Sequence, residues 1–453
     1  MQSTFRRFRN RVYTALLCSG LSVTTCMGAA QTHSAEIGLG EAMRLTISQS
    51  PVLVQTQARM AQATARVQQS RSANGPNISL PASVSHQEYG ESSTIGTLSQ
   101  QSSVTYYRLG LSASWTLFDG FARRNRNLSA EEAETQSRAA YDDSVRLLMG
   151  NVAAAFHTAQ LADANLRIAA ADETFNRRSL KEAQARFDLG AGSRSESLNF
   201  EARANAAASE VLRQRERRTT AQTALAEVMG QATAALPLGV VPVTEGDGLS
   251  LPLSGTNVTD LIRAAMTFRP DVRAAKLGIR RSVADVAVAK GERWPHVDLG
   301  GSLDGERQDD ASFDGEDFGN TVALSMRYAF SDGGQRRGRI SEAQAVVDER
   351  EAVLQALSIR VASEVRQALA SVAGTGARLA LQERNAATVS ENRDLTEREY
   401  RAGQTSLVRL NEAQRDLTSA QAQLALARVA LRQARVRLLV ATGEILSVLT
   451  KRE

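Results

Sequence analysis

The chain is poor in the residues that build disulfide-linked, metal-binding or phosphate-binding sites. Its 453 residues include two cysteines, four histidines and eight prolines, and aromatic residues make up 5%. Both cysteines, Cys18 and Cys26, lie before residue 31, so the rest of the chain cannot form a disulfide scaffold. The histidines are far apart, and no zinc-protease or phosphate-loop motif is present. We therefore expect no enzyme activity, no metal and no cofactor.

Long hydrophobic runs are missing as well. No segment after residue 30 has the run of about 18 apolar residues that a membrane-spanning helix needs. Residues 1–30 combine a basic start, a short apolar stretch and small residues, which is typical of a secretory signal peptide, with lipidation at Cys26 as an alternative. Removing this segment takes away four arginines and no acids, which lowers the formal net charge from +5 to about +1. Nucleic-acid binding therefore has little support.

A short pattern occurs twice in the chain. The stretches WTLFDGFARR at 115–124 and YAFSDGGQRR at 328–337 each join an apolar run to an Asp-Gly pair and two arginines. Prolines repeat with a constant offset as well: Pro51 with Pro270, and Pro76 with Pro295. We interpret the chain as two copies of one unit that is much longer than a solenoid repeat. The predicted division is a signal peptide over 1–30, a first unit over 31–232, a Pro- and Gly-rich linker over 233–256, a second unit over 257–443 and a C-terminal tail over 444–453.

Each unit is predicted to contain a helix, two strands, a long helix and a closing helix. The expected helices lie near 39–73, 121–188 and 195–229 in the first unit, and near 257–291, 335–401 and 406–441 in the second. At about 1.5 Å per residue, each long helix spans about 100 Å, which matches two of the shorter helices placed end to end. We therefore expect the shorter pair to lie beside the long helix.

Apolar residues spaced 4-3-4-3 predict coiled packing of these helices. One seam consists of Ala413, Leu417, Ala420, Leu424, Ala427, Leu431, Ala434, Leu438 and Ala441, and a similar one runs from Val145 to Ala169. A second seam on the last helix consists of Ala422, Leu426, Val429, Val436 and Val440. Two seams indicate neighbours on both sides, as in a ring of helices, whereas a two-stranded coiled coil needs only one.

Four segments alternate apolar and polar residues with a period of two: 77–85, 107–117, 296–304 and 321–330. Strands of about ten residues with this alternation are typical of outer-membrane barrels, although soluble hairpins alternate too. Four strands cannot close a barrel, and an open sheet edge is not tolerated in lipid. Several chains must then share one barrel, and three chains would supply twelve strands.

The repeated pattern is predicted to mark the points where strand and helix meet. Asp119-Gly120 and Asp332-Gly333 would turn a strand into a long helix, because Gly permits the bend and Asp suits the positive end of the helix dipole. Pro76 and Pro295 would end the incoming helices before the strands begin. The arginine pairs after each Asp-Gly would lie at the polar edge of a membrane.

The segments between paired strands are predicted to be extracellular loops. They are EYGESSTIGTLSQQSS, from residue 88, and RQDDASFDGEDFG, from residue 307. The second contains five acids, which leave a cation site open as an alternative to a solvated loop: Asp309, Asp310, Asp314, Glu316 and Asp317.

The order of these features resembles the TolC-like family of outer-membrane export channels. The resemblance is carried by the helix starts at Pro51 and Pro270, the proline-to-strand entries, the Asp-Gly junctions and the turns FDLGAGSRSESL and YRAGQTSLVRL. It implies a mainly α fold with a small β part, in which a homotrimer forms a periplasmic α-barrel and a shared twelve-stranded β-barrel in outer-membrane lipid. It also implies a periplasmic adaptor and an inner-membrane ABC or proton-driven pump as partners.

The resemblance further implies a periplasmic gate at the helix turns. Its matching positions are Glu196, Tyr400, Thr405, Arg409 and Glu412. Better-known family members have an acid in place of Arg409 and a base in place of Thr405, so our hypothesis is that Arg409 pairs with Glu412 or Glu196 across a closed mouth. Solvated helix-end charges are the alternative.

The resulting prediction is a passive outer-membrane duct of a Gram-negative bacterium. Its cargo is left open between type I protein secretion and small-molecule efflux, because the pump is another chain. An extended periplasmic or surface coiled-coil structural protein is the alternative function.

Overall fold

The computed structural model describes residues 36–88, 103–236, 239–240 and 257–450, all within one compact unit. The helices of the first half are α1 (Leu39–Gln49), α2 (Pro51–Ser72), α3 (Ala122–Asp188) and α4 (Arg194–Val228). Those of the second half are α5 (Val258–Phe268), α6 (Pro270–Gly291), α7 (Gln335–Arg401), α8 (Leu407–Thr442) and α9 (Ile445–Thr450). The strands are β1 (Glu36–Ile37), β2 (Asn77–Ser79), β3 (Ala82–Glu88), β4 (Ser103–Phe118), β5 (Gly239–Val240), β6 (His296–Gln308) and β7 (Phe318–Arg327), with one 3-10 turn at Gly315–Asp317. The predicted signal peptide, most of the first loop and most of the linker lie outside the described residues.

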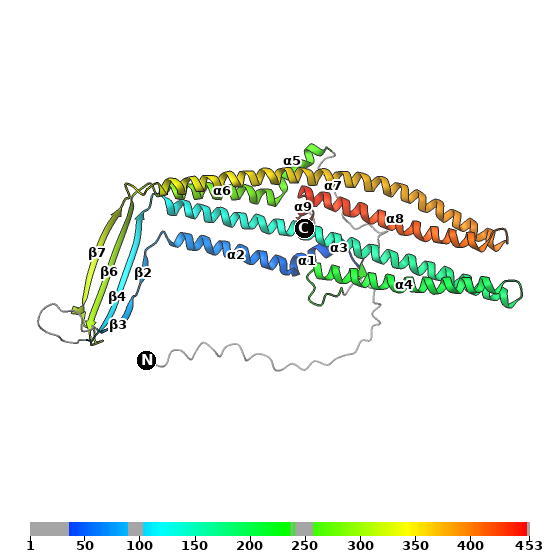
Figure 1. The fold of residues 1–453 in the computed structure, drawn as a ribbon, viewed down its shortest axis with the longest axis horizontal. Coiled ribbons are helices and arrows are strands. Elements are labelled where there is room, and N and C mark those ends of the chain that lie inside the picture. The colour runs from blue at the N-terminus through cyan, green and yellow to red at the C-terminus, as the bar shows by residue number, and fades with distance from the viewer. Residues whose placement is uncertain (1–35, 89–102, 237–238, 241–256, 451–453) are drawn as a thin grey trace, which may run out of the picture. The chain divides into compact units, whose positions relative to one another are not determined.

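The helices run side by side, with the sheet at one end and the α3–α4 and α7–α8 turns at the other (Figure 1). α3 and α7 have 67 residues each, as predicted. α2 and α4 lie along α3, and α6 and α8 lie along α7, so the short helices accompany the long ones. This mainly helical architecture with a small sheet confirms the predicted fold class. No helix among the described residues is long and apolar enough to cross a membrane.

The first helix of each half is broken, which corrects the continuous helices expected near 39–73 and 257–291 and agrees with the helix starts that the resemblance placed at Pro51 and Pro270. α1 ends before Pro51 and α5 ends before Pro270, and the residues between, Ser50 and Arg269, have extended backbone angles. A proline disfavours the helical conformation of the residue before it and donates no backbone hydrogen bond. Each proline therefore starts a new helix instead of lying inside one.

The breaks are the places where the short helices meet end to end. Gly230 follows α4 with φ +77°, and a Cβ there would lie 3.0 Å from the carbonyl oxygen of Gln49 at the end of α1. Gly443 follows α8 with φ +80°, and a Cβ there would lie 3.0 Å from the carbonyl carbon of Phe268 at the end of α5. Glycine therefore ends both helices and allows the next helix to approach closely.

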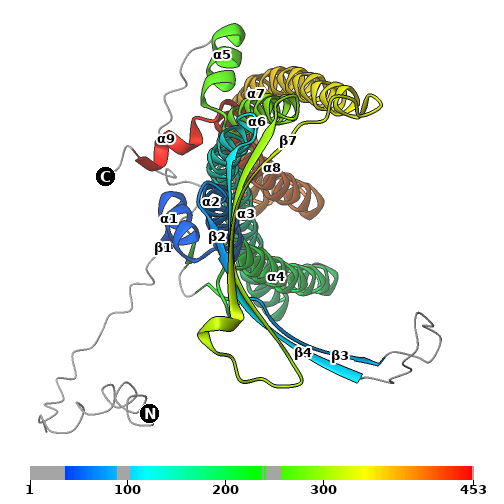
Figure 2. The same ribbon diagram turned by 90° about the vertical axis from the view of Figure 1, so that its left-hand side faces the viewer.

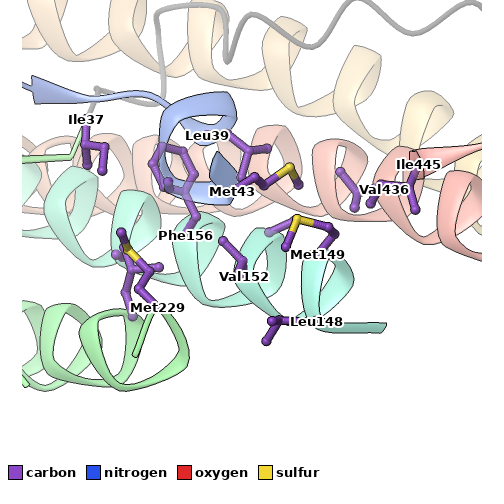
Figure 3. Packing of buried hydrophobic residues seen from close by; sticks show 14 of the residues in the cluster. Ile37, Leu39, Met43, Leu148, Met149, Val152, Phe156, Met229, Val436 and Ile445 are labelled. Atoms are coloured by element: carbon purple, nitrogen blue, oxygen red, sulfur yellow. The ribbon is translucent and has the colours of Figure 1, made fainter. Parts of the chain in front are cut away.

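The largest core cluster lies at this middle level of the helices. α3 contributes Met149, Val152 and Phe156, which pack against residues of α1 and the strand before it (Figure 3). β1 pairs with β5 in parallel, so part of the predicted linker joins this layer. Ile445, in the segment predicted to be a tail, begins α9 and is 1% exposed within the same cluster.

Most of the predicted helix seam is buried. Seven of its nine residues on α8 are buried in the single chain, while Leu424 and Leu431 are partly exposed. The second seam is less complete, because Leu426 is 54% exposed. α7 is also poorly covered: six of its 67 residues are buried, compared with eighteen of α3. The outer face of α7 thus has no partner within the described part of the chain.

The main sheet has the strand order β2-β4-β6-β7, and β3 pairs with β4 beyond β2. The expected strand over 77–85 is divided because Pro81 has no N–H to donate, although its carbonyl accepts from Gly110 at 2.9 Å. All pairings in this sheet are antiparallel, and Figure 2 shows the sheet curving away from the helices. Cross-strand neighbours such as Trp115, Leu299 and Leu324 share one face. The other face is polar.

Two buried arginines lie at the middle of the helices: Arg269 binds elements of the second half, and Arg146 joins the first half to the second. Arg269 donates to both carboxylate oxygens of Asp271, to Glu364 on α7 at 2.5 Å and to the carbonyl of Ala441 at 3.2 Å. Arg146 on α3 donates to the carbonyl of Val440 and pairs with Asp271. Burial lowers the pKa of Arg269, but the hydrogen bonds from Arg269 to Asp271 and Glu364 outweigh burial and raise it. The side chain of Arg269 is 3% exposed and connects α6, α7 and the end of α8.

Replacing Arg269 with Ala is expected to lower the free energy of unfolding by about 3 kcal/mol, because the partly buried carboxylates of Asp271 and Glu364 and the carbonyl of Ala441 lose their buried partner. Arg263→Ala is the matched control: Arg263 pairs with Asp260 at the surface with 72% side-chain exposure, and its loss is expected to cost less than about 1 kcal/mol. Urea unfolding of the detergent-solubilised protein, followed by circular dichroism, measures both. Equal losses would contradict a structural role for Arg269.

Candidate functional site

Each strand-to-helix junction contains an aspartate that pairs with the arginine four residues later. Asp119 accepts a hydrogen bond from the backbone N–H of Arg123 at 2.8 Å and pairs with its Nε at 3.3 Å. Asp332 accepts from the backbone N–H of Arg336 at 3.0 Å and from its Nε at 2.6 Å. Hydrogen bonding from Arg336 lowers the pKa of Asp332. Each aspartate thus satisfies a free N–H in the first turn of a long helix and orients the arginine.

Each arginine also donates hydrogen bonds to two backbone carbonyls, one near the end of the preceding strand and one just after the incoming helix. Arg123 donates to the carbonyl of Leu117 on β4 at 3.3 Å and to that of Ala73, just after α2, at 3.2 Å. The second arginine makes the same contacts in its own half. Arg336 donates to Ala329 at 2.7 Å and to Glu292, just after α6, at 3.5 Å. We call these two sets of contacts the junction clamps.

The clamps give the arginine pairs a role that sequence reasoning missed. The position of both arginines at a polar membrane edge stays a prediction, and the first of each pair binds backbone carbonyls within its own chain. The signal available in the sequence was the spacing, because Asp119 and Arg123 lie four residues apart, as do Asp332 and Arg336, and such pairs meet on a helix.

The predicted glycines and prolines lie at these junctions. Gly120 and Gly333 have φ values of +65° and +63°, in the left-handed region. Pro76 directly precedes β2, and Pro295 directly precedes β6. In the first half, Trp115 also holds the segment between α2 and β2, because its indole N–H donates to the carbonyl of Asn74 at 2.9 Å. Sequence reasoning placed Trp115 in the alternating segment 107–117 but missed this bond.

At the opposite end of the helices, the turns carry the predicted gate residues (Figure 1). Ser193 and Ser406 begin α4 and α8, and their side chains accept from the backbone N–H of Glu196 and Arg409 at 3.1 and 3.4 Å. Glu196 and Arg409 therefore occupy the same position of the first helical turn. An acid is favourable there, whereas a base is opposed by the helix dipole.

Glu196 connects the two turns. It accepts a hydrogen bond from the hydroxyl of Tyr400, at the end of α7. It also pairs with Arg186 at 3.5 Å, and the Arg186 guanidinium lies 5.3 Å from the centre of the Tyr400 ring. Burial, followed by the hydrogen bond to Glu196, raises the pKa of Tyr400 to about 12. The hydroxyl thus keeps its proton at neutral pH, and the contact is lost only as the pH rises from about 10 toward 12. Arg186 was not among the predicted residues.

The other three predicted residues are not brought together with Glu196. Thr405 is partly buried just before α8, and Arg409 and Glu412 are exposed on its first turns. Neither Arg409 nor Glu412 forms an ion pair with a described residue of the same chain. The hypothesis that Arg409 pairs with an acid across a closed mouth therefore stays a prediction about contacts between chains.

A second set of contacts joins the two turns farther from the tip, and sequence reasoning missed it. Arg178 on α3 pairs with Glu397 on α7 at 2.6 Å, and Arg393 pairs with the same carboxylate at 2.9 Å. Both guanidinium groups lie over the ring of Phe175, at 5.9 and 5.0 Å from its centre. α3 and α7 therefore share charged and aromatic contacts above the turns.

The acidic loop after β6 is held by internal contacts. Arg307 pairs with Asp317 at 3.2 Å and with Asp310 at 3.5 Å, and Asp314 begins the 3-10 turn in a capping box with Asp317. Within the described ranges, no group of three or more His, Cys, Asp or Glu residues is placed to hold a metal ion.

Replacing each junction glycine with alanine separates two costs: the strain of a positive φ, and the collision of the new Cβ with neighbouring atoms. A Cβ at Gly333 would meet nothing within 4 Å, so Gly333→Ala is expected to cost about 1–2 kcal/mol from its positive φ alone. A Cβ at Gly120 would collide with the carbonyl oxygen of Gly291, so Gly120→Ala is expected to cost more. Urea unfolding of the two variants gives the comparison. A larger loss at Gly333 would show that the first junction is not tightly packed.

Comparisons with known proteins agree with this architecture. The family model of the outer membrane efflux protein matches residues 42–231 and 261–444. The chain is 28% identical to Protein CyaE of Bordetella pertussis over 416 residues, which cover 90% of this chain and 85% of that protein. Two solved channels share its fold. The outer-membrane channel OprN has a TM-score of 0.74 and 23% identity, covering 89% of both chains. The CmeC outer membrane channel of Campylobacter jejuni has a TM-score of 0.76 and 16% identity, covering 89% of this chain and 85% of that one.

The family match spans most of both halves and includes both sets of turns. It supports the predicted resemblance, the outer-membrane location and the export function, and it does not support the alternative of a coiled-coil structural protein. The family is one of channel proteins. The chain belongs to the outer membrane efflux protein family and is an export channel of the Gram-negative outer membrane.

Proposed function

We propose that three copies of this chain form one continuous duct that accepts cargo from a periplasmic adaptor and an inner-membrane pump. The observation that carries the proposal is the pair of unpaired edges in the sheet. Among the described residues, β7 has no partner strand on one side of the sheet, and β2 and β3 have none on the other. Unpaired backbone groups are not tolerated in lipid, so the edges of neighbouring copies must pair.

The strand directions fit such a closure. Neighbouring strands in the sheet are antiparallel throughout, so β7 of one copy would meet β2 and β3 of the next in the antiparallel sense. β2 and β3 follow one another along β4 and occupy one strand position, which gives four positions in each chain. Three copies give twelve, an even number within the range of outer-membrane barrels.

The exposed face of α7 supports the same closure in the helical part. α7 contacts α6 and α8 within its chain, and its other side exposes large apolar residues. They are Val346, Val353, Ile359, Leu381 and Leu395, exposed by 37% to 66%. Apolar positions repeated along 67 residues favour a neighbouring helix over water. In a ring of copies that neighbour is α2 or α4 of the next chain.

Two copies of one helix–strand–helix unit, over 31–232 and 257–443, account for this arrangement. The same order of elements in both halves and the two junction clamps support this division. The mature chain would begin after a signal peptide over 1–30.

The turns at the far end would form the gate of the duct. The contact between Glu196 and Tyr400 holds the α3–α4 turn against the α7–α8 turn within one chain. Arg409 is exposed at a helix start where a positive charge is unfavourable, which favours an acidic partner on the neighbouring copy. Glu412 and Glu196 of that copy are the proposed partners of Arg409, and Thr405, just before α8, is proposed to belong to the same gate.

Cargo is proposed only by class. Efflux and export proteins occur among its relatives, including the outer membrane efflux protein BepC of Brucella suis, which is 25% identical over 345 residues. Proteomics of the medium separates the two classes. Loss of one or a few exported proteins from a strain lacking this chain indicates protein secretion, and an unchanged set indicates small-molecule efflux.

Arg409→Ala is expected to raise single-channel conductance in planar bilayers by roughly twofold or more, because the closed mouth loses its ion pairs. Arg398→Ala is the matched control, since Arg398 is exposed in the last turn of α7 and has no ion pair among the described residues. Its conductance should equal that of the wild type. Unchanged conductance in Arg409→Ala would remove Arg409 from the gate while leaving the duct intact.

A further inference from the structure

An open basic and aromatic pocket lies where the second half of the sheet meets its helices. Its volume is about 840 Å³, and it is lined by Lys290, Arg293, Trp294, Pro295, Met326, Tyr328 and Phe330. We call it the basic aromatic pocket. The Tyr328 and Phe330 rings contact each other edge to face, with centroids 4.9 Å apart. Trp294 is 58% exposed and Phe330 is 90% exposed, so the pocket opens at the surface of the chain.

The pocket opens on the apolar face of the sheet. Met326 is paired with Val297, and both belong to the alternate positions that carry apolar side chains on β6 and β7. Tyr328 and Phe330 continue the same alternation beyond the end of β7. The pocket therefore adjoins the face that a membrane strand turns to lipid, at the level where the helices begin.

The equivalent junction in the first half shows what the basic residues of the pocket would do if they only stabilised the fold. In the first half, Arg71 occupies the position of Lys290 and pairs with Glu131 at 2.7 Å. The residue that corresponds to Glu131 in the second half is Gln344, which carries no charge. Lys290 is thus left without an ion pair among the described residues.

The other pocket residues also differ from their counterparts. Asn74 and Gly75 stand in the first half where Arg293 and Trp294 stand in the second. Arg293 has no ion pair within the described ranges either. A strand-to-helix junction therefore needs neither the second cation nor the large aromatic side chain, because the first half is built without them.

We infer that the basic aromatic pocket binds an anionic phospholipid from the membrane leaflet that faces the helices. Two cations without ion pairs match a phosphate headgroup, and the aromatic rings suit the boundary between headgroup and acyl chains. Met326 and Phe330 offer apolar surface to the chains. This inference rests on the proposed duct only in that the apolar face of the sheet must face lipid.

The chain's two tryptophans allow a direct test. Trp115→Phe leaves Trp294 as the single tryptophan, inside the pocket. The protein is reconstituted in vesicles, and quenching of its fluorescence by phosphatidylglycerol with brominated acyl chains is compared with quenching by brominated phosphatidylcholine. We expect phosphatidylglycerol to be preferred by about 25-fold, since each of the two basic residues near an anionic headgroup contributes about fivefold.

Adding Lys290→Gln and Arg293→Gln should abolish this preference. The matched control adds Lys276→Gln and Arg280→Gln, which remove two exposed charges from the same helix outside the pocket, and should keep it. Equal quenching by the two lipids in the parent, or an equal loss in both double variants, would overturn the inference. So would an unquenched Trp294, because a neighbouring copy would then cover the pocket. Single-channel recordings separate the two proposals: channels without lipid preference contradict only the lipid site, and absence of channels contradicts the duct.

Discussion

The change from strand to helix is the constraint on which the rest of this chain depends. A sheet with period-two alternation must lead directly into a helix of 67 residues, and this happens twice. At each junction one aspartate satisfies the first helical turn and one arginine binds the carbonyl at the end of the strand and the carbonyl after the incoming helix. Because three elements meet on one guanidinium, the direction of the strands fixes the direction of the helices over their whole length.

The two halves share this junction and differ in what is attached to it. In the second half, Arg269 replaces Ser50 at the helix break and binds both α7 and the end of α8. Arg409 replaces Glu196 at the helix turn, and a basic aromatic pocket replaces the neutral entry beside Asn74. Features common to both halves serve the architecture, whereas features of one half are candidates for gating and for binding.

The sequence predicted the parts of the fold that have a sustained pattern. The long helices and the α8 seam follow from spacing over many turns, and the Asp-Gly junctions follow from the repeat. The helix ranges drawn from the residues ran through Pro51, although the family resemblance placed a helix start there. β1 and β5, with two residues each, have no pattern to detect, and their pairing joins segments far apart in the chain.

The candidate site was predicted less completely. Glu196 and Tyr400 were found through resemblance and are in contact, but Arg186 and the pair of Arg178 with Glu397 depend on how α3 crosses α7. Contacts of Arg409 and Glu412 with another copy lie beyond a single chain. Arg123 and Arg336 bind backbone carbonyls. Every residue has a carbonyl, so the sequence does not show which ones an arginine will bind.

The most direct test of the account is whether β7 of one copy pairs with β2 of the next. Both cysteines of the chain lie in the predicted signal peptide, so one cysteine on β2 and one on β7 can be introduced into a cysteine-free mature protein and scanned over register. The account predicts that oxidation in outer membranes yields a covalent species of three chains that does not grow further. Chains that stay uncrosslinked at every register, or a ladder that extends beyond three, would contradict a closed trimeric duct.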